Sequence, residues 1–237
     1  MDRTIRWDGF HNTRDLGGLP TRDGTTRRGA FYRGADPRFV TAAGWARARA
    51  AGVRTVIDLR NPAEIPPDPP PPGLIRMNVP IDDADDMDFW EYVRDPGLDG
   101  SPLYYPLFLE RKAARCAELV ETLARAAPGG VLFHCVSGRD RAGLTALLLL
   151  SLAGVEPEAI AADYALSTEA VQPLYAALGV EDQGSLIASL LAQRGTTTTG
   201  AVLAALDGFD AREYLLAAGV SGAALDDLRR RLVAPAR

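Results

Sequence analysis

The chain has 237 residues, of which 47% are hydrophobic and 24% are charged, proportions that are ordinary for a globular protein. Its 26 basic and 31 acidic residues give a net charge of −5. That balance argues against a nucleic-acid-binding protein, because such proteins usually carry a basic excess. Two cysteines are too few for a disulfide framework in a chain of this length.

No segment has the character of a leader or a membrane anchor. Residues 1–10 contain no apolar signal core, and the longest apolar run, 144–153, is too short to span a bilayer. No group of Cys and His residues has the spacing of a zinc site. We therefore expect a cytoplasmic protein in a reducing compartment, without metal, other cofactor or integral membrane segment. Its oligomeric state is left open.

Strands alternate with helices through the first two thirds of the chain. This alternation predicts an α/β protein whose central, mostly parallel sheet is flanked by helices. β-branched and apolar runs mark the strands, and capping and stop residues mark the helices. Strands are expected at 31–33, 53–59, 75–81 and 131–134, helices at 41–51, 111–127 and 141–153, an extended proline-rich loop at 66–72 and an acidic loop at 82–88.

After residue 155 the pattern predicts helices only. We expect one domain over residues 1–237, with a core at about 10–167 and a helical extension at about 168–237 that serves as a lid, a packing layer or an oligomer surface. The helices are expected at 157–167, 169–178, 185–193, 211–217 and 221–233, with a Thr/Gly link at 196–200.

The segment that carries chemistry is VLFHCVSGRDRAGL, residues 131–144, which reads as strand, loop and helix. A loop that enters a helix turns its backbone N–H groups inward and forms a concavity for an anion. Five residues separate Cys135 from Arg141, enough to wrap one tetrahedral phosphate, and arginine can bind two phosphate oxygens as a fork. The phosphate-binding loop therefore comprises Val136, Ser137, Gly138, Arg139, Asp140 and Arg141.

Cys135 is the expected nucleophile. A helix N-terminus and a nearby arginine stabilise a thiolate, which can attack phosphorus and form a cysteinyl-phosphate. The loop amides and Arg141 would then stabilise the charge on the equatorial oxygens. The alternative is a buried structural cysteine, which is what we expect of Cys116 rather than a redox partner of Cys135.

The leaving group needs an acid, and three aspartates are candidates. Asp82 and Asp83 follow the third expected strand, and Asp140 lies inside the loop. A general acid must reach the ester oxygen and have a raised pKa. The alternatives are a solvated acidic loop and, for Asp140, a helix cap. His134 points away from Cys135 because neighbouring strand residues face opposite sides, so we expect it to order the loop by hydrogen bonding.

HCVSGRDRAG closely resembles the HCxxGKDRTG signature of the atypical bacterial tyrosine phosphatases. That family includes a secreted mycobacterial phosphatase that acts on phosphoproteins and phosphoinositides. The resemblance spans residues 10 to about 167 and is weaker in the helical tail. Its other motifs are NTRDLGG at 12–18, FYRG at 31–34, VIDLR at 56–60 and ADYALS at 162–167.

The resemblance implies a cysteine-phosphatase-like fold with Cys135 as nucleophile and Arg141 as phosphate ligand. It also implies that Asp140 is a catalytic or loop-ordering carboxylate. Arg139 stands where the family has a lysine that is linked to a second phosphate or a lipid headgroup. Arginine keeps that charge and changes its shape.

Four further positions follow from the same resemblance. Arg14, Asp15 and Arg60 match family positions near the pocket, and we expect them to form ion pairs that hold the N-terminal segment to the sheet. Ala142 departs from the family, which usually has a hydroxyl residue there. Because that hydroxyl can hydrogen-bond the departing sulfur, the second step is expected to be slow, and Thr145 is not expected to substitute.

The expected function is a protein-tyrosine phosphatase whose partner is a phosphorylated protein. A phosphoinositide or dual-specificity phosphatase is the alternative, supported by Arg139. A phosphate-binding pseudophosphatase is the non-enzymatic alternative, raised by Ala142.

Overall fold

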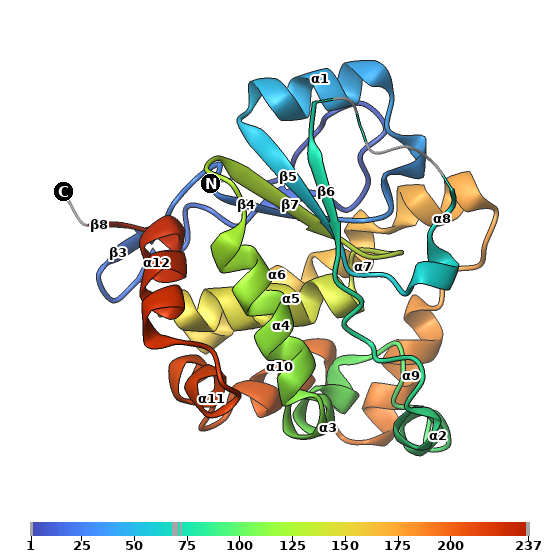
Figure 1. Ribbon diagram of the computed structural model, residues 1–237. Coiled ribbons are helices and arrows are strands. Elements are labelled where there is room, and N and C mark those ends of the chain that lie inside the picture. Colours follow the sequence, from blue (N-terminus) through green and yellow to red (C-terminus); the bar gives the residue numbers. More distant parts are fainter. Residues whose placement is uncertain (1, 68–70, 72, 236–237) are drawn as a thin grey trace.

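The computed structural model describes residues 2–67, 71 and 73–235. Its centre is a five-stranded sheet in the order β1-β4-β7-β5-β6, in which β4, β7, β5 and β6 are parallel and β1 is an antiparallel edge (Figure 1). The predicted α/β class with a mostly parallel sheet is confirmed. The strands are β1 (Arg14–Asp15), β4 (Phe31–Gly34), β5 (Val53–Asp58), β6 (Ile75–Asn78) and β7 (Gly130–His134).

Helices cover both faces of this sheet. Successive side chains of a strand point to opposite faces, so Tyr32 and Leu132 pack with Trp45 of α1 (Ala42–Ala50), while Phe31 and Phe133 enter the larger core on the other face. In Figure 1 α1 lies on one side of the sheet, and α4, α5 and the helices α10 to α12 lie on the other. The next helices along the chain are α2 (Met87–Arg94), α3 (Tyr105–Arg111), α4 (Ala113–Arg125) and α5 (Asp140–Ala153), with 3-10 turns η1 (Pro37–Phe39), η2 (Pro62–Glu64) and η3 (Pro102–Tyr104).

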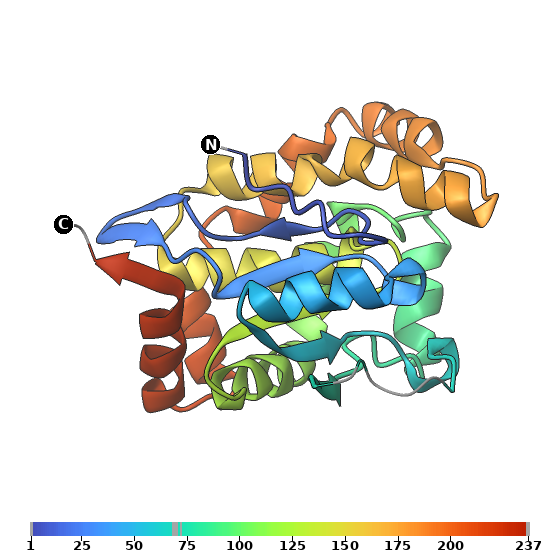
Figure 2. The same cartoon turned by 90° about the horizontal axis from the view of Figure 1, so that it is seen from above.

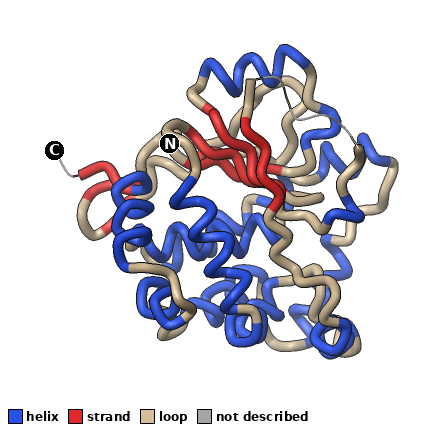
Figure 3. The backbone as a smooth tube through the Cα atoms, in the orientation of Figure 1, coloured by secondary structure: helices blue, strands red, loops and turns tan. Residues whose placement is uncertain are grey.

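The C-terminal third is mostly helical, and its end returns to the N-terminal part of the chain (Figure 2). Its last element, β8 (Val233–Pro235), pairs antiparallel with β3 (Gly24–Thr26), which pairs with β2 (Pro20–Thr21). Figure 3 shows this small sheet apart from the central one. The helices are α6 (Pro157–Ala165), α7 (Ser167–Ala170), α8 (Gln172–Leu178), α9 (Gly184–Gln193), α10 (Thr198–Leu206), α11 (Ala211–Ala217) and α12 (Gly222–Leu232).

Two expectations for the C-terminal third were wrong. The link at 196–200 contains the start of α10, whose N-cap Thr197 accepts a hydrogen bond from the N–H of Gly200. Thr and Gly are poor helix formers, but burial of Val202 and Leu206 stabilises this helix. The expectation of helices only after residue 155 fails at β8, because a strand that pairs with a distant segment carries little local signal.

Two expectations for the first two thirds also need correction, and a third falls partly on residues that the structure does not describe. The acidic loop at 82–88 ends early, because Asp86 caps α2 by accepting a hydrogen bond from the N–H of Phe89. The helix expected at 111–127 starts at Ala113, and α3 before it was not predicted. The expected extended loop at 66–72 lies partly outside the described residues. Among the helices described, none combines the length and apolar character needed to cross a membrane.

Candidate active site

The loop from Cys135 to Arg141 begins where β7 ends and runs into the first turn of α5. It therefore lies at the carboxyl end of the parallel strands, where open α/β sheets usually bind ligands. Gly138 has φ +70°, and a Cβ there would lie 2.6 Å from the carbonyl carbon and oxygen of Gly34. Only glycine allows this close approach between the loop and the end of β4.

Donors outside the loop hold its carbonyl oxygens. They come from three parts of the chain: the N-terminal segment, the end of β4 and α3. Because the carbonyl groups are bound from outside, the loop keeps its shape without any ligand. The bonds are Asp36 N to Val136 O (2.9 Å), Asn12 Nδ2 to Ser137 O (2.9 Å), Arg33 Nη2 to Gly138 O (3.0 Å) and Arg139 O (3.1 Å), and Tyr105 Oη to Asp140 O (2.6 Å).

The N–H groups of the same loop differ from its carbonyl oxygens in their hydrogen bonding. Those of Val136, Ser137 and Gly138 donate to no acceptor among residues 2–67, 71 and 73–235. Successive unpaired amides followed by a helix N-terminus form an anion-binding concavity. The loop next to Cys135 is therefore built to accept an external anion.

Arg141 is held by two carboxylates. Its Nη1 and Nη2 lie 2.6 and 2.8 Å from the two oxygens of Glu64, and Nη1 lies 3.1 Å from Oδ2 of Asp82. Burial opposes the charge of Arg141, but Glu64, Cys135 and Asp82 keep its pKa above the ordinary value. The bidentate contact fixes the plane of the guanidinium group. Sequence reasoning missed Glu64, whose only local signal is the capping box that it forms with Asn61.

The two neighbouring aspartates of the acidic segment have opposite surroundings. Burial raises the pKa of Asp82 to about 6. The negative charges of Glu64 and Asp140 also raise this pKa, whereas the positive charge of Arg141 lowers it. Asp83 has its carboxylate bound by Arg115 at 2.6 Å and by Lys112 at 2.9 Å, and these hydrogen bonds lower its pKa. The structure therefore brings Asp82 to the loop and directs the carboxylate of Asp83 elsewhere.

Asp140 and Arg139 are bound to each other and to their surroundings. The hydroxyl of Tyr164 donates to Oδ1 of Asp140 at 2.9 Å, and Nε of Arg139 lies 3.3 Å from the same oxygen. Arg139 also donates from Nη2 to the carbonyl oxygen of Gly100 at 2.9 Å and is only 8% exposed. Its guanidinium group is thus bound within the protein.

His134 lies behind the loop in a fully buried position. Its Nδ1 is 3.2 Å from the carbonyl oxygen of Cys135, and its Nε2 is 3.7 Å from Oδ2 of Asp58. Burial lowers the pKa of His134, although Asp58 acts in the other direction. The ring contacts the backbone next to the nucleophile.

The three residues expected to hold the N-terminal segment differ in what they bind. Arg14 lies in β1 and pairs with Asp163 of α6 at 3.1 Å, so its side chain ties the edge strand of the sheet to a helix. Arg60 is bound to carboxylates on both sides, Asp58 at 2.7 Å and Asp36 at 2.6 Å. The carboxylate of Asp15 instead accepts the N–H groups of Gly17 and Gly29.

Arg33 is the main support of the loop that sequence reasoning missed. It is 1% exposed, binds Asp163 at 2.7 Å through Nη1 and reaches two loop carbonyls through Nη2. Asp163 also binds Arg3 and Arg14. Burial opposes the charge of Asp163, but the three arginines hold its pKa below the usual range. The signal was available, because Arg33 and Asp163 lie in the FYRG and ADYALS motifs.

The second cysteine, Cys116, lies in the hydrophobic core. Cys116 is fully buried in α4, which confirms it as a core residue, and burial raises its pKa to about 11. Both cysteines are free. No group of three or more His, Cys, Asp or Glu side chains in the described part of the chain is arranged to hold a metal ion.

The sequence model of a family described as "Tyrosine phosphatase family" matches residues 5–234. A "Putative tyrosine-protein phosphatase" of Cupriavidus necator is 31% identical over 186 residues, covering 70% of this chain and 63% of that protein. A "Tyrosine-protein phosphatase" of Nostoc commune is 32% identical over 146 residues, covering 58% and 48%. The "Triple specificity protein phosphatase PtpB" of Mycobacterium tuberculosis is 30% identical over 199 residues, covering 71% and 70%. The chain thus spans less than two thirds of the first two relatives.

Proposed function

We propose that this chain, which belongs to the tyrosine phosphatase family, hydrolyses phosphomonoesters and prefers phosphotyrosine in proteins. One observation carries the proposal. Outside donors hold the carbonyl oxygens of the loop, while the N–H groups of Val136, Ser137 and Gly138 beside Cys135 have no acceptor in the part of the chain that the structure describes. The names of the relatives, all protein phosphatases, agree with it.

In the proposed reaction the thiolate of Cys135 attacks phosphorus, and the bond from phosphorus to the ester oxygen breaks. Arg141 and the loop amides stabilise the charge on the equatorial oxygens, and Asp82 gives its proton to the leaving oxygen. Water then attacks the cysteinyl-phosphate and passes a proton to the carboxylate of Asp82. Inorganic phosphate leaves and the thiolate is restored. His134 orders the loop from behind and transfers no proton.

Asp82 is our choice for the acid because it meets both requirements. Its carboxylate lies 3.1 Å from Arg141, the proposed phosphate ligand, and its pKa is raised to about 6. Asp83 meets neither requirement, since Lys112 and Arg115 hold it and lower its pKa. Asp140 is bound by Tyr164 and Arg139, which fits a role in ordering the loop.

Replacement of Asp82 by asparagine is expected to slow hydrolysis of phenyl phosphate about 100-fold and that of 4-nitrophenyl phosphate much less. The nitrophenolate is a good leaving group and needs little protonation. In the unmodified protein, kcat for phenyl phosphate should fall as the pH rises through about 6, because the protonated acid is then lost. The Asp82→Asn variant should lose this fall. Steady-state kinetics from pH 4.5 to 8 measure both effects.

Asp83→Asn is the matched control and should stay within a few-fold of the unmodified protein. Asp140→Asn tests the competing assignment. If Asp140→Asn slowed hydrolysis of phenyl phosphate more than that of 4-nitrophenyl phosphate, while Asp82→Asn left both rates unchanged, Asp140 would be the general acid.

The phosphoinositide alternative rested on Arg139. Because that side chain is buried and bound to Gly100 and Asp140, it is poorly placed to receive a second phosphate. We therefore favour a phosphoprotein substrate. Comparing kcat/KM for a phosphotyrosine peptide with that for a soluble phosphoinositide decides between the two.

Ala142 bears on the second step of the proposed reaction. Replacement by serine should restore the hydroxyl that assists departure of the sulfur, since the hydroxyl of Thr145 is already bound to the carbonyl oxygen of Arg141 at 2.9 Å. A hydrogen bond to a charged group contributes about 1.5 kcal/mol or more, so breakdown of the phosphoenzyme should accelerate about ten-fold. Rapid-quench measurement of the burst and steady-state phases tests this.

Ala146→Ser places the same hydroxyl one turn further along α5 and should leave both phases unchanged. An unmodified protein that binds phosphate and forms no phosphoenzyme would support the pseudophosphatase alternative.

We further propose that the whole chain is one phosphatase domain with a helical extension, acting in the cytoplasm. The family match from 5 to 234 supports the first part, as do contacts such as the hydrogen bond from Tyr214 to the carbonyl oxygen of Leu109. The two free cysteines support the second part.

A further inference from the structure

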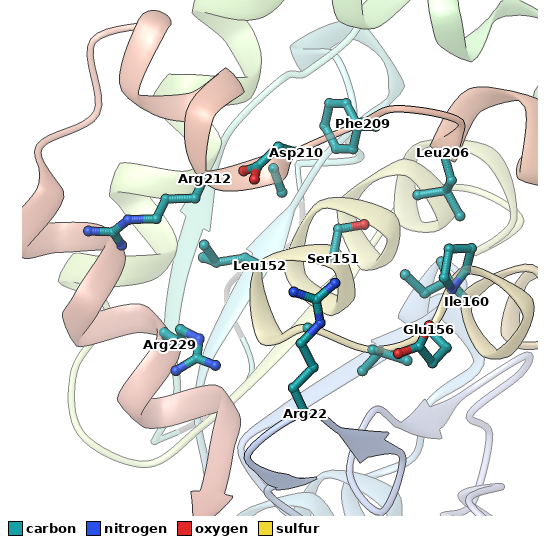
Figure 4. Close-up of a pocket in the computed structure, with 14 residues that line it drawn as sticks. Arg22, Ser151, Leu152, Glu156, Ile160, Leu206, Phe209, Asp210, Arg212 and Arg229 are labelled. Carbon is teal, nitrogen blue, oxygen red and sulfur yellow. The ribbon is translucent and has the colours of Figure 1, made fainter.

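A cavity of about 340 Å³ lies at the far end of α5 from the phosphate loop. Its walls come from the end of α5, the start of α6, the connection from α10 to α11, the β2–β3 hairpin and α12 (Figure 4). Ser151 lies about 16 Å along the axis of α5 from Asp140, at a rise of 1.5 Å per residue. A ligand here would not enter the catalytic pocket.

One side of the cavity is apolar and contains an aromatic ring. Leu152, Ile160, Leu206 and Phe209 line it, and the ring of Phe209 is held against that of Tyr214 with their centroids 5.2 Å apart. The volume falls within the range of small-molecule sites, whose linings are mostly apolar with a few polar groups. This wall suits a one- or two-ring aromatic group.

The other side is lined by three arginines, of which two are paired. Figure 4 shows the side chain of Arg22 extending from the hairpin toward Ser151, while Arg212 points away from the centre. Arg212 pairs with Asp226 and Arg229 pairs with Asp23, whereas Arg22 forms no ion pair with any residue that the structure describes. Arg22 is thus the cation left for a ligand.

Two carboxylates also line the cavity, and they limit the ligand to low charge. Asp210 caps α11 by accepting a hydrogen bond from the N–H of Glu213 at 2.8 Å, so the start of that helix offsets part of its negative charge. Glu156 is exposed at the edge. A ligand with a single negative group beside Arg22 is compatible with these two carboxylates, whereas a ligand with several negative charges would be repelled by them.

A buried hydroxyl gives an independent indication. Oγ of Ser151 is shielded from solvent and has no hydrogen-bond partner among residues 2–67, 71 and 73–235. Buried polar groups in proteins are almost always paired. Ser151 lines the cavity toward which Arg22 extends, and rotation about its Cα–Cβ bond would let the unpaired hydroxyl donate to an acceptor bound beside Arg22.

We propose that this cavity binds a small aromatic monoanion. Its carboxylate or sulfonate group contacts Arg22 and the hydroxyl of Ser151, and its ring packs against Phe209 and Leu206. The site is independent of the proposed catalytic function, because the cavity shares no lining residue with the phosphate loop.

The test uses 1-anilinonaphthalene-8-sulfonate as the probe, with fluorescence titration of protein saturated with vanadate so that the phosphate loop is filled. We expect saturable binding at one site. Arg22→Ala should weaken it about ten-fold, the size expected for a lost hydrogen bond to a charged group. Ser151→Leu should abolish it by filling the cavity. Arg28→Ala, which removes another exposed arginine just after the same hairpin, should change the Kd less than two-fold.

Leu186→Ser is the control for binding of the probe to an exposed apolar surface, because Leu186 on α9 is 69% exposed. This substitution should also leave binding unchanged. The proposal fails if Arg22→Ala and Arg28→Ala weaken binding equally, if Leu186→Ser abolishes it, or if vanadate displaces the probe. Should Ser151→Leu not fold, as judged by circular dichroism, the comparison of Arg22→Ala with Arg28→Ala decides alone, because both side chains are exposed.

Discussion

Replacement of Cys135 by serine is expected to abolish phosphate release while phosphate binding persists. Serine lacks the nucleophilic thiolate, so no cysteinyl-phosphate can form, and a loss of at least about 10⁴-fold in kcat is expected for removal of a catalytic nucleophile. The donors that hold the loop carbonyls come from outside the loop and are unaffected by the change. Phosphate release from an aryl phosphate and calorimetric titration with phosphate measure the two properties separately.

Cys116→Ala is the control for this experiment, since it removes the other free thiol from the core of α4. It should lower stability and leave kcat unchanged. Undiminished turnover in the Cys135→Ser variant would exclude the covalent mechanism. Loss of phosphate binding in that variant would show that the loop needs the sulfur to keep its shape.

Arg33→Met is expected to have the largest effect of any change outside the loop. Methionine roughly matches the length of arginine and makes none of its hydrogen bonds, so Gly138 O and Arg139 O lose their donor and Asp163 loses one of three cations. Breaking a buried ion pair by removing one partner costs about 3 to 5 kcal/mol. A shift of the loop by about 1 Å would lower kcat/KM about 100-fold. Urea denaturation and phosphatase kinetics at low temperature provide the two measurements.

Arg3→Met separates the two effects of that change. Arg3 also binds Asp163, but it has no contact with the loop carbonyls. The Arg3→Met variant should therefore be less stable than the unmodified protein. Its kcat/KM, calculated per folded molecule, should be unchanged. Equal losses of kcat/KM in the two variants would mean that Arg33 acts only through Asp163.

Much of the central architecture was predictable because its signals are local. The apolar runs at 53–59 and 131–134 identified β5 and β7, and the all-apolar run after Arg141 identified the buried helix α5. The spacing of Cys135 and Arg141 between a strand and a helix identified the loop. The family match over residues 5–234 confirms the resemblance that the loop motif indicated.

The parts that escaped prediction depend on contacts between distant segments. Arg33 and Asp163 are 130 positions apart, and the motifs that contain them do not reveal that the two side chains pair beneath the loop. Asp82 and Asp83 are equivalent in the sequence. They differ in the structure because Asp83 adopts φ +52° and turns toward Lys112, while Asp82 faces Arg141. Backbone conformation at one residue thus distinguishes the two candidates for the acid.

The small sheet joins the two ends of the chain, since β3 pairs with β8 and Arg27 donates to the carbonyl oxygen of Val233, 206 positions later. During synthesis on the ribosome, β3 emerges long before β8, so the edge of β3 that β8 covers stays open until about 206 further residues have been made. An unpaired edge of this kind invites association with other chains. Protein truncated before β8 is therefore expected to aggregate more readily than the full chain, even though its phosphate loop is complete.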